Sequence, residues 1–189
     1  MIVDLPNSYW IYVLPSDSAF PVEYQGKKLS KDEYLEHFGK WVVMGTRVHL
    51  DELAKELDPY VEEREIHSIK YTRDAEEIFD LDECVLCIYC DDREREDLWQ
   101  ILKKHGVSQK SWVYEREVYE MWSPEGIMLE KCLVAEGLEK GSPEYEKKVA
   151  AVKHAQEIWL EGQFGTGKKA RDFKHKGYWS FEHMVNETL

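Results

Sequence analysis

A pattern of strand, helix and strand occurs twice in this chain of 189 residues, and it limits the folds that the chain can form. In residues 40–72 an apolar run precedes a helical stripe of leucines and a second β-rich run. Residues 84–119 repeat this order, and their helical stripe includes Leu98, Ile101 and Leu102. Each helix must bury one apolar stripe, so two such units side by side predict a four-stranded antiparallel sheet with both helices on one face.

Further elements extend this core on both sides. The apolar run at residues 9–14 predicts an edge strand, and Ser30 with Glu33 forms a capping box that begins a short helix. Pro59 disfavours helical geometry at the residue before it, so we expect a kink or a break at Asp58. Strict alternation predicts that residues 112–119 form the last strand, whereas residues 127–138 fit a strand or a helix.

The resulting fold class is α+β, with a mainly antiparallel sheet in the order β-β-α-β-β-α-β. Ser142 and Pro143 predict the start of one more helix, which ends at Gly162 and leads into a basic tail. We therefore expect a sheet domain at residues 1–140, with residues 141–189 forming a helix and tail packed on it or extending from it.

Charge and composition narrow the classes of function. The net charge of −13 opposes general coating of nucleic acid. No apolar run approaches the ~20 residues of a membrane span, and the first residues lack the features of a secretory leader. Three of the four cysteines fall in one apolar run instead of a turn, and no second pair lies elsewhere, so they fit buried reduced thiols better than a zinc site. We expect a cytoplasmic protein without a membrane partner.

The extended strand order resembles the fold of the cap-binding translation initiation factor. More closely, the chain resembles the uncharacterised Bles-type family, named after the basophilic leukaemia expressed protein, and prokaryotic proteins labelled as phosphothreonine lyase domain proteins. The resemblance covers roughly residues 9–122 and is carried by Gly39-Lys40-Trp41, by Ile69-Lys70-Tyr71 and by the strand-helix-strand of 84–119. It implies a ligand that bears a phosphate, but no cap-binding residue can be carried over, because the tryptophans do not align.

Basic residues in or beside the predicted strands are candidates for a phosphate site. Lys40, Lys70 and Arg116 can line the sheet face that lacks helices, and Arg73 follows just after Lys70. Trp41 joins them as an aromatic candidate through the resemblance. The alternative is an exposed sheet face whose lysines and arginines form cross-strand ion pairs with Glu115 or Glu117.

The basic tail contains a second candidate site. Residues 162–169 come within one residue of a P-loop, but Lys169 replaces the hydroxyl residue that would hold magnesium. The segment also follows a helix instead of a strand, which argues against nucleotide hydrolysis. Lys168, Lys169 and Arg171 can still bind one phosphate, and the alternative is a tail that neutralises the acidic body or is disordered.

A phosphothreonine lyase needs a base for proton removal and an acid for the leaving group. Lys70 and His67 are the nearest such pair, but three positions of separation place them on opposite sides of one strand; His175 is the alternative acid. The other histidines show no metal-ligand spacing, so we expect neither a metal nor a cofactor.

Three functions therefore remain open. The first is a binding module for a phosphate-bearing ligand, such as a nucleotide, an RNA end or a phosphopeptide. The second is a phosphothreonine lyase-like enzyme. The third is a protein-interaction domain, which leaves homo-oligomers open. The candidate binding residues are Lys40, Trp41, Lys70, Arg73, Arg116, Lys168, Lys169 and Arg171.

Overall fold

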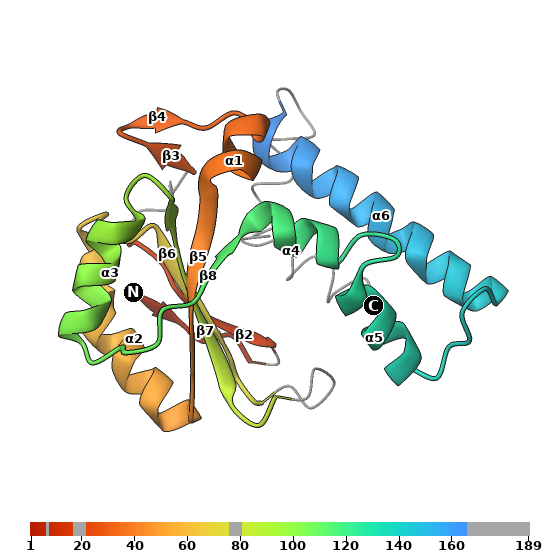
Figure 1. Cartoon of the computed structure of the whole chain (residues 1–189), viewed down its shortest axis with the longest axis horizontal. Helices are drawn as coiled ribbons and strands as arrows, with labels where there is room; N and C mark the ends of the chain where they lie inside the picture. Colours follow the sequence, from red (N-terminus) through yellow and green to blue (C-terminus); the bar gives the residue numbers. More distant parts are fainter. Residues whose placement is uncertain (7, 17–21, 76–80, 166–189) are drawn as a thin grey trace. The chain divides into compact units, whose positions relative to one another are not determined.

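The chain forms two compact units, Met1–Glu115 and Arg116–Leu189. The computed structural model describes residues 1–6, 8–16, 22–75 and 81–165 (Figure 1). The division falls between Glu115 and Arg116, whereas the sequence pattern placed a boundary after residue 140. The sheet and the helices α1 to α3 belong to the first unit.

A six-stranded sheet forms the centre of the first unit, in the order β1-β2-β6-β7-β5-β8. All neighbouring strands are antiparallel, and the longest ladder joins β5 to β7 from Phe38 opposite Asp91 to Gly45 opposite Cys84. The strands are β1 (Ile2–Val3), β2 (Trp10–Val13), β5 (Phe38–Gly45), β6 (Ser68–Thr72), β7 (Cys84–Asp91) and β8 (Trp112–Tyr114).

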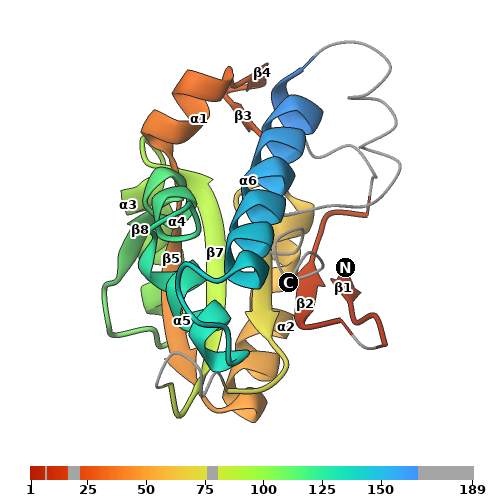
Figure 2. The same ribbon diagram turned by 90° about the vertical axis from the view of Figure 1, so that its right-hand side faces the viewer.

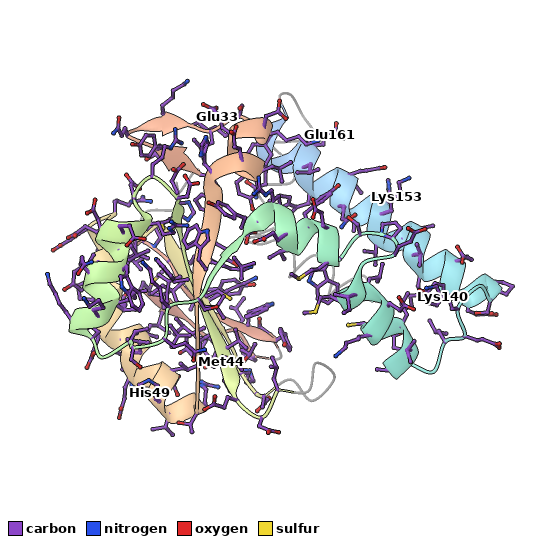
Figure 3. The ribbon with its side chains drawn as sticks, in the orientation of Figure 1. Glu33, Met44, His49, Lys140, Lys153 and Glu161 are labelled. Carbon is purple, nitrogen blue, oxygen red and sulfur yellow. The ribbon has the colours of Figure 1, made fainter. Side chains whose placement is uncertain are left out.

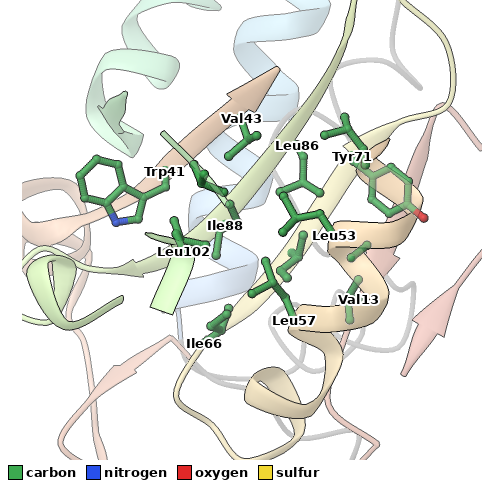
Figure 4. Close-up of a cluster of buried hydrophobic side chains, with 14 of the residues drawn as sticks. Val13, Trp41, Val43, Leu53, Leu57, Ile66, Tyr71, Leu86, Ile88 and Leu102 are labelled. Atoms are coloured by element: carbon green, nitrogen blue, oxygen red, sulfur yellow. The ribbon is translucent and has the colours of Figure 1, made fainter. Parts of the chain in front are cut away.

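The two helices of the repeated pattern cover one face of this sheet (Figure 1). They are α2 (Arg47–Glu62) and α3 (Arg95–Lys104), and their apolar stripes pack on alternate residues of the central strands. Figure 4 shows this core, which includes Trp41, Leu53, Leu57, Leu86, Ile88 and Leu102. The predicted α+β class, with a mainly antiparallel sheet and helices on one face, is therefore confirmed.

A small hairpin and a short helix come before β5. The strands β3 (Glu23–Tyr24) and β4 (Lys27–Lys28) pair with each other, and they lie beside α1 (Lys31–His37) in both views (Figures 1 and 2). Ser30 caps α1 and forms the predicted capping box with Glu33, which confirms that helix start. In Figure 3, Glu33 of α1 and Met44 of β5 lie well apart.

The approach of β8 to β5 explains a glycine in the middle of the sheet. A Cβ atom on Gly39 would lie 2.5 Å from Cζ2 of Trp112 and 2.7 Å from the carbonyl oxygen of Val113. The indole ring of Trp112 therefore lies across the glycine on the neighbouring strand, and any larger residue would push the two strands apart.

Two expectations about local structure are wrong. The strand predicted at residues 112–119 ends at Tyr114, and α4 (Glu115–Met121) follows. Val118 and Trp122 are both buried and lie four residues apart, which is the spacing of a helix. Their packing outweighs the alternating pattern of residues 112–119. Of the kink or break predicted at Asp58, the break does not occur: α2 continues through Pro59, and burial of Leu57 and Val61 stabilises its last turns.

The second unit is helical in its described part. Residues 127–138, which the sequence left open, form the helix α5 (Ile127–Ala135). The helix α6 (Pro143–Phe164) begins at Ser142 as predicted and continues through Gly162, where we expected it to end. Within this unit, the side chain of Gln156 donates a hydrogen bond to the carbonyl oxygen of Tyr119 at 3.3 Å.

None of the described helices combines the length and the apolar composition that a membrane-spanning helix needs.

Candidate functional site

Alternation along the central strands separates the core from a second, chemically different face. On β5, Trp41 and Val43 belong to the core beneath α2 and α3, so Lys40 and Val42 point to the other face. The same rule places Lys70 of β6 on that face, because its neighbours Ile69 and Tyr71 are core residues. The sheet therefore brings Lys40 and Lys70 to one side, as the sequence predicted.

Lys70 lies between aromatic rings instead of in solvent. Its side chain is among the largest that are fully buried, with the residue 1% exposed. The ammonium nitrogen is 4.1 Å from the ring centre of Trp10 and 5.7 Å from that of Tyr89. Ring faces attract cations, and these two rings stabilise a charge that burial would otherwise strongly disfavour.

Lys40 approaches the same tyrosine from the neighbouring strand. Its ammonium group donates a hydrogen bond to the Tyr89 hydroxyl at 3.3 Å and lies 5.1 Å from the ring centre. The same nitrogen is 2.9 Å from Oε1 of Glu115, and both side chains are 5% exposed. That contact lacks the alignment of a hydrogen bond, so its attraction is chiefly electrostatic.

Glu115 is in turn held from the other side by α1. The hydroxyl of Tyr34 donates a hydrogen bond to Oε2 of Glu115 at 3.0 Å. Tyr34 also stacks on Phe38, and Phe38 stacks on Tyr89, with ring centres 5.2 and 6.1 Å apart. The carboxylate is therefore fixed in place beside Lys40.

These contacts define one group of side chains within the first unit, the lysine–aromatic cluster. Its charged members are two ammonium groups and one carboxylate. Such a buried group can attract an anion, because charges interact far more strongly in a protein interior than in water. Its members are Trp10, Tyr34, Lys40, Lys70, Tyr89 and Glu115.

The other predicted site residues lie elsewhere. Trp41 is a core residue on the opposite face, and its indole N–H donates to the carbonyl oxygen of Arg95 at 3.2 Å. The guanidinium of Arg73 donates to the carbonyl oxygens of Ser8 and Leu5 at 3.0 and 3.1 Å, and it pairs with Asp4. Arg73 therefore holds the N-terminal segment.

The remaining predicted residues belong to the second unit. Arg116 is an exposed residue of α4. Lys168, Lys169 and Arg171 lie outside the described residues, as does the second half of the P-loop-like segment, residues 166–169. Gly162, the first glycine of that segment, is inside α6.

Sequence reasoning missed the aromatic members of the cluster. Trp10 lies on β2 opposite Thr72, and Tyr89 lies on β7 opposite both Ser68 and Lys40. The alternation of each strand gives the face of these residues, but only the register brings their rings beside the lysines. The ion pair of Lys40 with Glu115 agrees with the alternative that the sequence offered, although this face is buried instead of exposed.

His67 lies on the same side of the sheet as Lys70. It precedes β6 by one residue, so strand alternation does not apply to it. Its ring centre is 5.1 Å from that of Phe38, which points to the Lys40 face and stacks on Tyr89. The expectation that His67 and Lys70 face opposite sides is therefore wrong.

A separate group beside the first residue of β5 resembles a metal site in its composition. His37, Asp91 and Asp92 offer ligand atoms within 4.8 Å of one another. However, Arg93 donates to both oxygens of Asp91 at 2.6 Å and lies 3.7 Å from the ring centre of Tyr24. Hydrogen bonds from Arg93 to Asp91 raise the pKa of the guanidinium. Arg93 thus supplies the positive charge that a metal ion would bring, and we assign no metal to this group.

The cysteines are free thiols, and three of them are buried. Cys84, Cys87 and Cys90 are buried in β7, and Cys132 of α5 is half-buried. Burial, followed by the nearby carboxylates of Glu94 and Asp91, raises the pKa of Cys90 well above its ordinary value. A raised pKa keeps this sulfur protonated at neutral pH and therefore unreactive.

Comparison of the chain with protein-family models, with curated proteins and with solved structures gives no match. The resemblance to the Bles-type family therefore stays a prediction, and the site must be argued from its own geometry.

The ion pair of Lys40 with Glu115 gives a test of the cluster. Glu115→Gln leaves a buried ammonium group without its carboxylate, so we expect a loss of about 3 kcal/mol in the free energy of unfolding. Lys40→Met should cost a similar amount, and the double variant should cost clearly less than the two together. Urea unfolding measures all three values.

Glu117→Gln is the matched control, because this glutamate is an exposed residue of the same helix. Its substitution should change the free energy of unfolding by less than about 0.5 kcal/mol. Additive losses in the double variant would show that the pair does not interact.

Proposed function

We propose that this chain is a binding module for a small ligand that bears a phosphate group, held at the lysine–aromatic cluster. The observation that carries the proposal is the convergence of two buried ammonium groups on one ring. Lys40 and Lys70 lie 5.1 and 5.7 Å from the centre of Tyr89. Proteins seldom bury lysines without a use for the charge.

The electrostatics of this arrangement favour an added anion. The ammonium groups of Lys40 and Lys70 carry like charges, which repel each other strongly where water is excluded. The carboxylate of Glu115 lies against Lys40. An anion that contacts both ammonium groups removes this repulsion and gains charge-assisted hydrogen bonds. A phosphate suits the position better than a carboxylate, because its oxygens point in several directions and can accept from both strands.

The acidic body of the protein limits the size of the ligand. A net charge of −13 repels a long polyanion, whereas a single phosphate is attracted once it is close to the two lysines. This contrast favours a nucleotide, an RNA end or a phosphopeptide over an extended nucleic acid. The rings of Trp10 and Tyr89 contact a lysine instead of stacking on a nucleotide base, so the phosphate is the group that the cluster recognises.

Calorimetry with defined ligands tests this proposal. We expect inorganic phosphate, adenosine monophosphate or a phosphothreonine peptide to bind the intact chain, and Lys40→Met or Lys70→Met to weaken the binding at least tenfold. Methionine keeps most of the side-chain volume, and circular dichroism shows whether each variant is folded.

Lys104→Met is the matched control, since Lys104 is an exposed lysine in the last turn of α3. It should leave binding unchanged. Absence of binding for all three ligands, or equal binding by folded Lys70→Met and by wild type, would refute the proposal.

A second candidate function follows from the position of His67. We propose it as an alternative in which Lys70, as a neutral amine, removes the proton beside the phosphate-bearing carbon of phosphothreonine. The electron pair of that C–H bond forms the alkene, the C–O bond breaks, and the phosphate leaves with a proton from His67. The support is that both residues lie on the face that contains Phe38 and Tyr89.

Mass spectrometry of a phosphothreonine peptide after incubation with the chain distinguishes this alternative from simple binding. Lyase activity predicts loss of the elements of phosphoric acid from the peptide, which leaves an alkene, and His67→Gln should abolish it. A peptide that binds and is recovered intact would rule out the lyase and leave the binding module.

A further inference from the structure

We infer that Trp10 is itself a binding residue of the lysine–aromatic cluster, and that its indole N–H donates a hydrogen bond to an oxygen of the bound phosphate group. This inference rests on the proposed function and deepens it. It assigns the cluster a third donor, on the edge of the sheet next to Lys70. It also identifies the chemical class of the bound group as an unprotonated tetrahedral oxyanion.

The indole nitrogen of Trp10 is the first observation. Trp10 is 9% exposed, and its Nε1 atom is buried without a hydrogen-bond acceptor among the described residues. A buried donor without a partner is destabilising, because the group has lost its hydrogen bonds to water and gained none. The indole of Trp41, by contrast, donates to a carbonyl oxygen.

The backbone around Trp10 fixes the ring in place. Its N–H donates to Oγ of Ser8 at 3.2 Å, and that hydroxyl donates to the carbonyl oxygen of Trp10 at 2.7 Å. The residue opposite on β6 is Thr72, and the ring of Tyr9 meets the indole edge to face at 4.9 Å between centres. These contacts hold the segment around Trp10, and its indole N–H is therefore a pre-positioned hydrogen-bond donor.

The distance to Lys70 allows one group to contact both donors. The ammonium nitrogen lies 4.1 Å from the ring centre of Trp10. The indole nitrogen is part of that ring, so the two donor atoms are no more than roughly 6–7 Å apart. A phosphate, whose oxygens are about 2.5 Å apart, spans such a gap with two hydrogen bonds of ordinary length.

The chemistry of the donors selects the ligand. An ammonium group and an indole N–H can only donate, so the oxygens that face Trp10, Lys70 and Lys40 must all be acceptors. A phosphate monoester in its dianionic form meets this requirement. A carboxylate has only two oxygens, which lie in one plane, and it cannot reach donors on β2, β6 and β5 together.

Nuclear magnetic resonance of the indole groups tests this inference in the intact chain. In protein labelled with nitrogen-15, titration with inorganic phosphate should move one indole N–H signal downfield, and Trp10→Phe should remove that same signal. Phenylalanine keeps a ring face for Lys70 but lacks the N–H. We expect Trp10→Phe to weaken phosphate binding about tenfold or more, which is the usual effect of losing one hydrogen bond to a charged group.

Trp112→Phe is the matched control. Its Nε1 atom is also buried without an acceptor in the described part of the chain, but Trp112 packs against the core on the helix side of the sheet. This variant should bind phosphate like wild type. If Trp10→Phe does not fold, the indole signal that moves in Lys70→Met identifies Trp10 instead, because that substitution removes the cation over its ring.

The two proposals fail in different ways. If phosphate binds to wild type and to Trp10→Phe with equal affinity, and no indole signal moves, the role of Trp10 is refuted and the binding module stands. If wild type does not bind phosphate at all, the proposed function is refuted together with this inference.

Discussion

The antiparallel ladder between β5 and β7 is the constraint on which the rest of the first unit depends. It pairs eight residues of each strand without interruption, from Phe38 with Asp91 to Gly45 with Cys84. Its register decides which side chains face the helices and which face away. A shift of one residue would place Lys40 in the core and Trp41 on the other face. The ladder thus builds the hydrophobic core and the lysine–aromatic cluster together.

The second face of the sheet shows how buried charge can be accommodated. Lys40 has a carboxylate at 2.9 Å, and Lys70 has a ring face at 4.1 Å. Buried ion pairs contribute little net stability, because desolvation of both groups offsets their attraction. An apolar pair at these positions would fold as well or better. The cost of keeping the two lysines is the physical reason to look for a function at this face.

Part of this account could be predicted from the sequence. The periodicity of the Leu50 and Leu98 stripes is strong, so the repeated pattern gave the fold class and the face that bears the helices. Capping chemistry at Ser30 and Ser142 located two helix starts. The end of β8 could not be predicted, because tertiary packing of Val118 and Trp122 overrides an alternating pattern.

Only part of the candidate site could be predicted from the sequence. Lys40 and Lys70 follow from alternation, whereas Trp10 and Tyr89 depend on the pairing of strands that are far apart in the sequence. Trp41 was a candidate through the resemblance, but it follows Lys40 directly, and neighbours on a strand point to opposite faces. Arg73 was chosen for its charge, and its bonds to Ser8 and Leu5 show a structural use that no local pattern reveals.

Anomalous diffraction from crystals soaked in tungstate, a heavy analogue of phosphate, tests the central claim most directly. The account predicts a peak within about 4 Å of Nζ of both Lys40 and Lys70, the distance that follows from charge-assisted hydrogen bonds to its oxygens. Tungstate bound elsewhere on the chain, with nothing beside these two lysines, would contradict it.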